Sequence, residues 1–184
     1  MRELPDRVNI EYLLGGLAPD TNAPMPEPMR QSIRQTWRRI QAEIPGTQFN
    51  FDFWEHCVPR RSTYAACRAV IAARQQSSDA GFRMLFAIQQ AYYLNARNPS
   101  DTEVLIDLAS QLALDTDIFS AALQSEQTQS DLLDEFGERD RLGAHSFPSL
   151  YLEHGSHSQR VPIEYVDADR LFGRLMDQIN KLSA

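Results

Sequence analysis

Residues 142–153 constrain the fold of this chain more than any other segment. They contain a turn at Gly143, a single X-Pro step from Phe147 to Pro148, and an alternating strand that runs on through Leu150 to Glu153. Proline has no N–H to donate, and within sheets it is confined to edge strands, first strand positions and bulges. We therefore expect an irregular loop up to the proline and a strand directly after it.

Hydrophobic periodicity predicts the other elements. Four prolines between residues 18 and 28 make that stretch a loop. The apolar residues of the helix at 80–95, Phe82 and Phe86 among them, cover more than half its circumference, so we expect that helix to be mostly buried. The pattern predicts a strand at 7–14, helices at 28–44, 64–76, 80–95, 102–112, 115–123 and 125–142, strands at 150–153 and 159–165, and a last helix capped by Asp167.

Length and charge narrow the class of protein. With 184 residues, 42% of them hydrophobic, the chain is long enough for one domain or for one domain carrying an insertion. A net charge of −7 argues against nucleic acid as a partner. No apolar run approaches the roughly 20 residues that span a bilayer, and the first residues do not read as a signal peptide. We expect a cytoplasmic protein without a membrane partner.

The order of strand, helices, two strands and helix resembles the DsbA-like branch of the thioredoxin superfamily, most of all its FrnE-like proteins. Residues 12–19 (YLLGGLAP), 51–54 (FDFW), 59–64 (PRRSTY) and 143–153 (GAHSFPSLYLE) carry the resemblance. It implies an α/β thioredoxin-like fold with a large helical insertion. Residues 1–17 and 140–184 would form the thioredoxin-like domain and residues 18–139 the inserted helical domain.

In that branch the X-Pro bond of this loop is cis, and a substrate backbone pairs with the residue before the proline. The resemblance therefore makes Ser146, Phe147 and Pro148 substrate-binding residues. A trans proline at the start of an edge strand is the alternative. The branch also has a Cys-x-x-Cys pair at the start of its first helix, and this sequence has none. We expect an N-terminally shortened version that lacks the first strand and the Cys-x-x-Cys helix, with the strand at 7–14 left without a neighbour.

The two cysteines, Cys57 and Cys67, are the remaining candidates for redox chemistry. Cys57 precedes a helix capped by Ser62 or Thr63 and lies near His56, Arg60 and Arg61, a setting that favours thiolate. Cys67 lies one turn into that helix among alanines and reads as a buried core residue. With Cys67 about one helical turn past the cap, the two thiols could come close enough in space to form a reactive or redox-sensing pair, although two separate thiols are the simpler interpretation.

Other polar groups give weaker indications. Arg60 and Arg61 suit a carboxylate of glutathione or of another anionic substrate, and a solvated loop explains them equally well. His154 and His157 flank a turn without further ligands nearby, so we expect no metal site. No cofactor is implied, with glutathione as the one candidate ligand.

Three functions follow from the resemblance. The first is a thiol–disulfide oxidoreductase or protein disulfide isomerase acting on protein or peptide thiols and disulfides, nearly inactive as it stands because Cys-x-x-Cys is absent. The second is a kappa-like glutathione-dependent transferase or isomerase. The third is a non-catalytic peptide-binding module, as a homodimer formed through the edge at residues 7–14.

Overall fold

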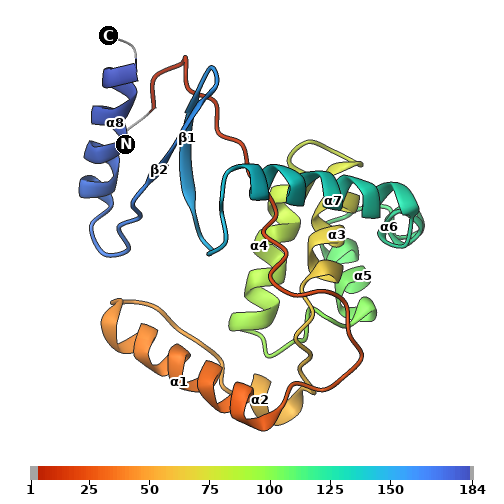
Figure 1. Ribbon diagram of the computed structural model, residues 1–184. Helices are drawn as coiled ribbons and strands as arrows, with labels where there is room; N and C mark the ends of the chain where they lie inside the picture. The colour runs from red at the N-terminus through yellow and green to blue at the C-terminus, as the bar shows by residue number, and fades with distance from the viewer. Residues whose placement is uncertain (1–3, 183–184) are drawn as a thin grey trace. The chain divides into compact units, whose positions relative to one another are not determined.

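The computed structural model describes residues 4–182 (Figure 1). By contacts the chain divides into two compact units, Gly16–Asp134 and Met1–Gly15 with Glu135–Ala184, which we call the helical unit and the terminal unit. In the described residues the elements are α1 (Glu27–Glu43), α2 (Phe53–His56), α3 (Tyr64–Arg74), α4 (Ala80–Tyr93), α5 (Thr102–Gln111), α6 (Thr116–Leu123), α7 (Glu126–Arg141), β1 (Leu150–His154), β2 (His157–Val161) and α8 (Ala168–Leu182). Helix α7 runs through the division.

The helical unit is built around α3, which packs against α4, α5 and α6 (Figure 1). Its residues 69–73 are all buried, and three of these five are alanines, which let neighbouring helices approach closely. Met84, Leu105 and Phe119 fill the space between the helices and are fully buried. Small residues on α3 facing large ones on its neighbours therefore give this unit a continuous core.

An aromatic cluster forms a second core in the helical unit. Trp37 of α1 stacks on Phe49 with ring centroids 4.8 Å apart and meets Trp54 edge to face at 4.9 Å. Phe53 and Trp54 are each 1% exposed. The short helix α2 places these two neighbours in the core, which the alternating aromatic sequence at residues 49–54 did not predict.

The terminal unit contains the predicted hairpin, but its second strand is His157–Val161 rather than the expected 159–165. Strands β1 and β2 are antiparallel in a register that runs from Leu150 opposite Val161 to His154 opposite His157. Gly155, with φ of 60°, begins the two-residue turn, a conformation that glycine adopts without strain. Helix α8 packs against β1, and Val161 and Ile179 are buried in this unit.

The predicted strand at residues 7–14 is wrong. Arg7 lies in a turn, residues 8–14 have no helix or strand, and Ile10 and Tyr12 are each 62% exposed. Alternation of apolar and polar residues stabilises a strand only where another strand accepts its hydrogen bonds. In residues 4–182 the sheet has two strands, β1 and β2, and neither pairs with this segment. The strand edge that the homodimer prediction relied on is therefore not present, and the homodimer stays a prediction.

The expectation that the 80–95 helix is mostly buried is also wrong. Phe82 and Phe86, four residues apart on α4, are 57% and 56% exposed, whereas Met84 and Ile88 on the other side are buried. Helix α4 packs against α3 and α5, and Phe82 and Phe86 lie outside the part of its surface that is buried. Periodicity showed a broad apolar surface but did not show how much of it finds a partner.

Candidate functional site

The loop at residues 143–149, which we call the proline loop, joins α7 to β1 in the terminal unit. Helix α7 ends where Gly143 takes a φ of 69°, and the N–H groups of Gly143 and Ala144 donate to carbonyls of the last helical turn. This is the usual way a helix satisfies its last carbonyls. The Phe147–Pro148 peptide bond is cis. The chain bends at residues 146–148 and enters β1 at Leu150, two residues after the proline.

Phe147 rests on the backbone of Gly15. A Cβ added to Gly15 would lie 2.6 Å from Cε1 of the Phe147 ring, so only glycine allows this approach. On its other side the Phe147 side chain remains open, because the residue is 43% exposed. The Phe147 ring thus packs against Gly15 on one side and is exposed on the other.

Two side chains of α7 fix the segment that ends at Gly15. Arg139 Nη1 donates to the Gly15 carbonyl at 2.7 Å, and the Leu14 N–H donates to Glu135 Oε2 at 2.7 Å. The Arg139 guanidinium also lies over the Phe136 ring, 4.6 Å from its centroid. Hydrogen bonds that involve a charged partner are stronger than neutral ones. Hydrogen bonds to the last turns of α7 therefore hold Gly15, the residue that the Phe147 ring packs against.

The hydrogen bonds of the proline loop do not involve the backbone N–H and C=O of Phe147. The Ser149 hydroxyl donates to the Ser146 carbonyl, and Pro148 has no N–H. Among the described residues nothing bonds to the N–H or C=O of Phe147. Both groups are therefore available to an extended chain laid beside the loop.

The other predicted site residues lie in the helical unit. Arg60 is half-buried, pairs with Asp101 Oδ1 at 2.6 Å and also donates to the Ser100 carbonyl, so it ties two loops of that unit together. Arg61 is exposed. The structure thus brings Ser146, Phe147 and Pro148 together in one loop, and it gives Arg60 a structural partner.

The thiolate-favouring setting predicted for Cys57 is wrong. Burial, and after it the negative charge of Asp101, raise the pKa of the Cys57 thiol above its ordinary value. Its Sγ donates to the Ala96 carbonyl at 3.1 Å, which holds the protonated form. Arg60, which was expected to favour thiolate, is paired with Asp101 instead.

Cys67 also differs from its prediction. It is half-buried on α3 rather than enclosed in the core, and both cysteines are thiols without a disulfide. Thr63 does not cap α3 with its side chain; its Oγ1 accepts from the Ala18 N–H at 2.9 Å and donates to the Ala18 carbonyl. Thr63 at the start of α3 therefore holds the loop that contains Ala18, which precedes α1 in the sequence.

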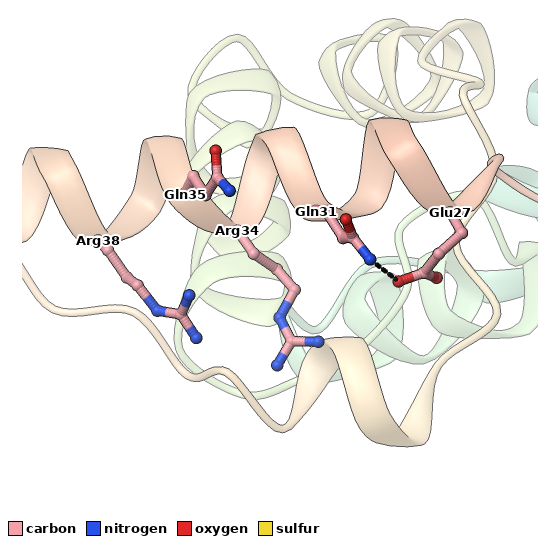
Figure 2. Close-up of a pocket in the computed structure, with 5 residues that line it drawn as sticks. All are labelled: Glu27, Gln31, Arg34, Gln35 and Arg38. Carbon is pink, nitrogen blue, oxygen red and sulfur yellow. Dashed lines mark hydrogen bonds between the residues drawn. The ribbon is translucent and has the colours of Figure 1, made fainter.

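A polar pocket of about 300 Å³ lies along α1 in the helical unit (Figure 2). Figure 2 shows the hydrogen bond between Gln31 and Glu27, which measures 3.1 Å. Arg34 pairs with Glu55 at 3.1 Å, and the Arg38 guanidinium lies over the Phe51 ring. Sequence analysis missed this pocket because its polar lining looks like the solvated face of an amphipathic helix. The pocket is lined by Glu27, Gln31, Arg34, Gln35 and Arg38.

Residues 4–182 hold no cluster of three or more His, Cys, Asp or Glu side chains placed to bind a metal ion. None of the helices in this range is long and apolar enough to cross a membrane.

Comparison with protein families gives one match over most of the chain. The family described as thioredoxin matches residues 2–161. Two curated relatives are ClpXP adapter proteins SpxH: the one from Halalkalibacterium halodurans is 31% identical over 53% of this chain, and the one from Bacillus subtilis is 26% identical over 79%. The matches span 31% and 51% of the length of these relatives.

Solved structures with a similar fold come from two further bacteria. A putative protein disulfide isomerase from Nitrosomonas europaea has a TM-score of 0.75 at 23% identity, over 89% of this chain and 79% of the other. The cytosolic disulfide reductase DsbM from Pseudomonas aeruginosa has a TM-score of 0.74 at 22% identity, over 95% and 86%. The same reductase with GSH has a TM-score of 0.72. These likenesses confirm the predicted fold class, a thioredoxin-like fold with a large helical insertion.

Proposed function

This chain belongs to the thioredoxin family, in its DsbA-like branch, and we propose that it provides the substrate-holding side of thiol–disulfide exchange. The observation that carries the proposal is the proline loop. Its Phe147 backbone has a donor and an acceptor open to a ligand, and its ring is held on Gly15 by a network anchored to α7. A substrate segment that contains a cysteine would bind here in extended form.

The bound segment would pair with Phe147 as one strand pairs with another. A residue of an antiparallel pair exchanges both its N–H and its C=O with one partner residue, so a single substrate residue uses both groups of Phe147. The missing N–H of Pro148 ends the pairing at that point. The loop would thus fix the substrate cysteine in one register, which is what positioning for attack on sulfur requires.

The exchange itself needs a thiolate that attacks a disulfide sulfur, forms a mixed disulfide and releases the other sulfur as thiolate; a second thiol then resolves the mixed disulfide. Cys57 is a poor nucleophile because its pKa is raised. Cys67 lies inside α3, away from the helix start where a thiolate is stabilised. We therefore infer that Cys57 and Cys67 are not the reacting pair of cysteines. The chain of 184 residues alone would then be nearly inactive.

The first test is the reduction of insulin by dithiothreitol. The chain should accelerate it little, and the Cys57→Ala, Cys67→Ala double variant should behave identically. Strong acceleration that the double variant loses would overturn the inference on the cysteines.

The second test measures binding of an S-methylated cysteine peptide, which cannot undergo exchange. Phe147→Ala keeps the backbone groups but removes the ring that rests on Gly15 and positions them, so it should weaken binding, whereas Phe86→Ala, which truncates another exposed phenylalanine on α4, should not. Equal affinity of both variants and the wild type would contradict a substrate-holding role for the loop.

A second candidate function follows from the curated relatives, both of which are named adapter proteins. An adapter would hold a protein segment in the same loop without redox chemistry. Replacing the peptide cysteine by serine separates the two. Exchange predicts a clear preference for cysteine, and an adapter role predicts none.

We also infer a cytoplasmic location, which the cytosolic reductase among the solved neighbours supports.

A further inference from the structure

One cation borders the proline loop without a carboxylate partner. Arg160 of β2 is exposed, and its Nη2 donates to Ser146 Oγ at 3.3 Å. That contact places the guanidinium beside the residue that precedes Phe147. Among the described residues Arg160 makes no ion pair.

A second arginine, Arg141, does have carboxylate partners. Arg141, at the end of α7, pairs with Glu138 at 2.5 Å and with Glu153 of β1 at 2.6 Å. Glu153 is diagonal to Arg160 across the hairpin, because Tyr151 is the residue directly opposite Arg160. Since Glu153 is already bonded to Arg141, the positive charge of Arg160 is not neutralised by this neighbour. Arg141 of α7 is thus neutralised by carboxylates, whereas Arg160 of the hairpin is available to an anion.

The register of the proposed substrate decides which of its groups meets Arg160. If a substrate cysteine pairs with Phe147 in antiparallel sense, the residue after the cysteine lies opposite Ser146. Neighbouring residues of an extended chain are about 3.3–3.6 Å apart along the strand. A charged group on that residue would therefore lie within reach of the guanidinium that contacts Ser146 Oγ.

We propose that Arg160 binds a carboxylate on the residue that follows the substrate cysteine, which makes it a specificity-determining residue of the proline loop. The inference rests on the proposed function, because it uses the pairing of the cysteine with Phe147. Guanidinium is the side chain best suited to carboxylate, with parallel donors that match its two oxygens. The chemistry fits both the terminal glycine of glutathione and an acidic residue in a protein segment.

The experiment measures dissociation constants of the whole chain for two pairs of S-methylated ligands. The first pair is S-methylglutathione and its C-terminal amide, and the second is a cysteine peptide with aspartate or asparagine after the cysteine. The acid should bind about two- to fivefold more tightly than its neutral partner, the range of an exposed ion pair. The pair that shows the difference identifies the source of the carboxylate.

Arg160→Gln should abolish the preference, so that the acid and its neutral partner bind with equal affinity. The matched control is Arg170→Gln, which removes the same charge from α8, where Arg170 lies near Glu164. It should keep the preference.

Equal binding of acid and neutral ligands to the wild type would overturn the role of Arg160. The proposed function would instead be overturned if the neutral cysteine peptide does not bind and if Phe147→Ala has the same dissociation constants as the wild type. The neutral ligands thus separate the two failures.

Discussion

Gly15 lies directly beneath the ring of Phe147, so the smallest side chain at this position is a structural requirement. A methyl group there would come within 2.6 Å of the ring. We expect Gly15→Ala to displace the half-exposed ring, to lower the free energy of unfolding by about 1 kcal/mol, the lower end for overpacking, and to weaken peptide binding. Urea unfolding and a binding titration measure the two effects.

Gly137 is the matched control for that substitution. It lies inside α7, and an added Cβ meets no atom within 4 Å. Gly137→Ala should raise the free energy of unfolding by about 0.5–1 kcal/mol, because alanine loses less backbone entropy in a helix. If both variants behave alike, the close approach of Gly15 to Phe147 has no consequence for the loop.

Cys57 should react slowly with alkylating agents. Its pKa is raised by burial and by Asp101, so the folded protein retains the thiol proton at a pH where an exposed cysteine has lost it. We expect the rate of alkylation by iodoacetamide in a Cys67→Ala variant to rise with pH at a higher midpoint in the folded than in the urea-unfolded chain. Equal midpoints would contradict the raised pKa.

The same shift makes stability depend on pH in one direction. Because the folded state holds the proton more tightly than the unfolded state, this contribution is complete below the ordinary pKa of cysteine. It is lost as the pH rises towards the raised pKa.

Among the elements, α6 depends most clearly on its cap. Asp115 Oδ1 accepts from the N–H groups of Asp117 and Ile118, both at 3.0 Å. Asp115→Ala should lower the free energy of unfolding by about 1 kcal/mol, the usual effect of losing a side-chain cap. Asp115→Asn keeps the acceptor and should change stability by only a few tenths of that. Thermal or urea unfolding of the wild type and the two variants measures these changes. If Asp115→Asn lowers the free energy of unfolding as much as Asp115→Ala does, the side chain of Asp115 does not stabilise α6 as a cap.

Helices and strands differ in how well their sequence predicted them. Each long helix was predicted from apolar periodicity and an end signal, for instance α1 from Trp37 and its stop at Pro45, and its bounds in the structure lie close to those expected. Residues 7–14 have the alternation of a strand but no strand beside them. A helix makes its hydrogen bonds within itself, whereas a strand makes them with a partner that the local sequence does not specify.

At the scale of the whole molecule, the two units should differ in local stability. The terminal unit has few buried apolar residues beyond Phe136, Val161 and Ile179, and a two-stranded hairpin is marginal alone. The helical unit has the continuous core around α3. We expect amides of β1 and β2 to open at lower free energy than those of α3 in native-state hydrogen exchange. Equal protection would show that the chain unfolds as one cooperative unit.

The sequence by itself determined the long helices, the hairpin, the proline loop and the resemblance to the DsbA-like branch, because these depend on local periodicity and on the special backbone of proline and glycine. Only the tertiary structure decided which polar groups are available. Arg60 is engaged by Asp101, Cys57 is held protonated, and Arg160, which no motif indicated, lies beside Ser146. The physical reason is that charge and reactivity depend on burial and on partners distant in sequence, which only folding brings together.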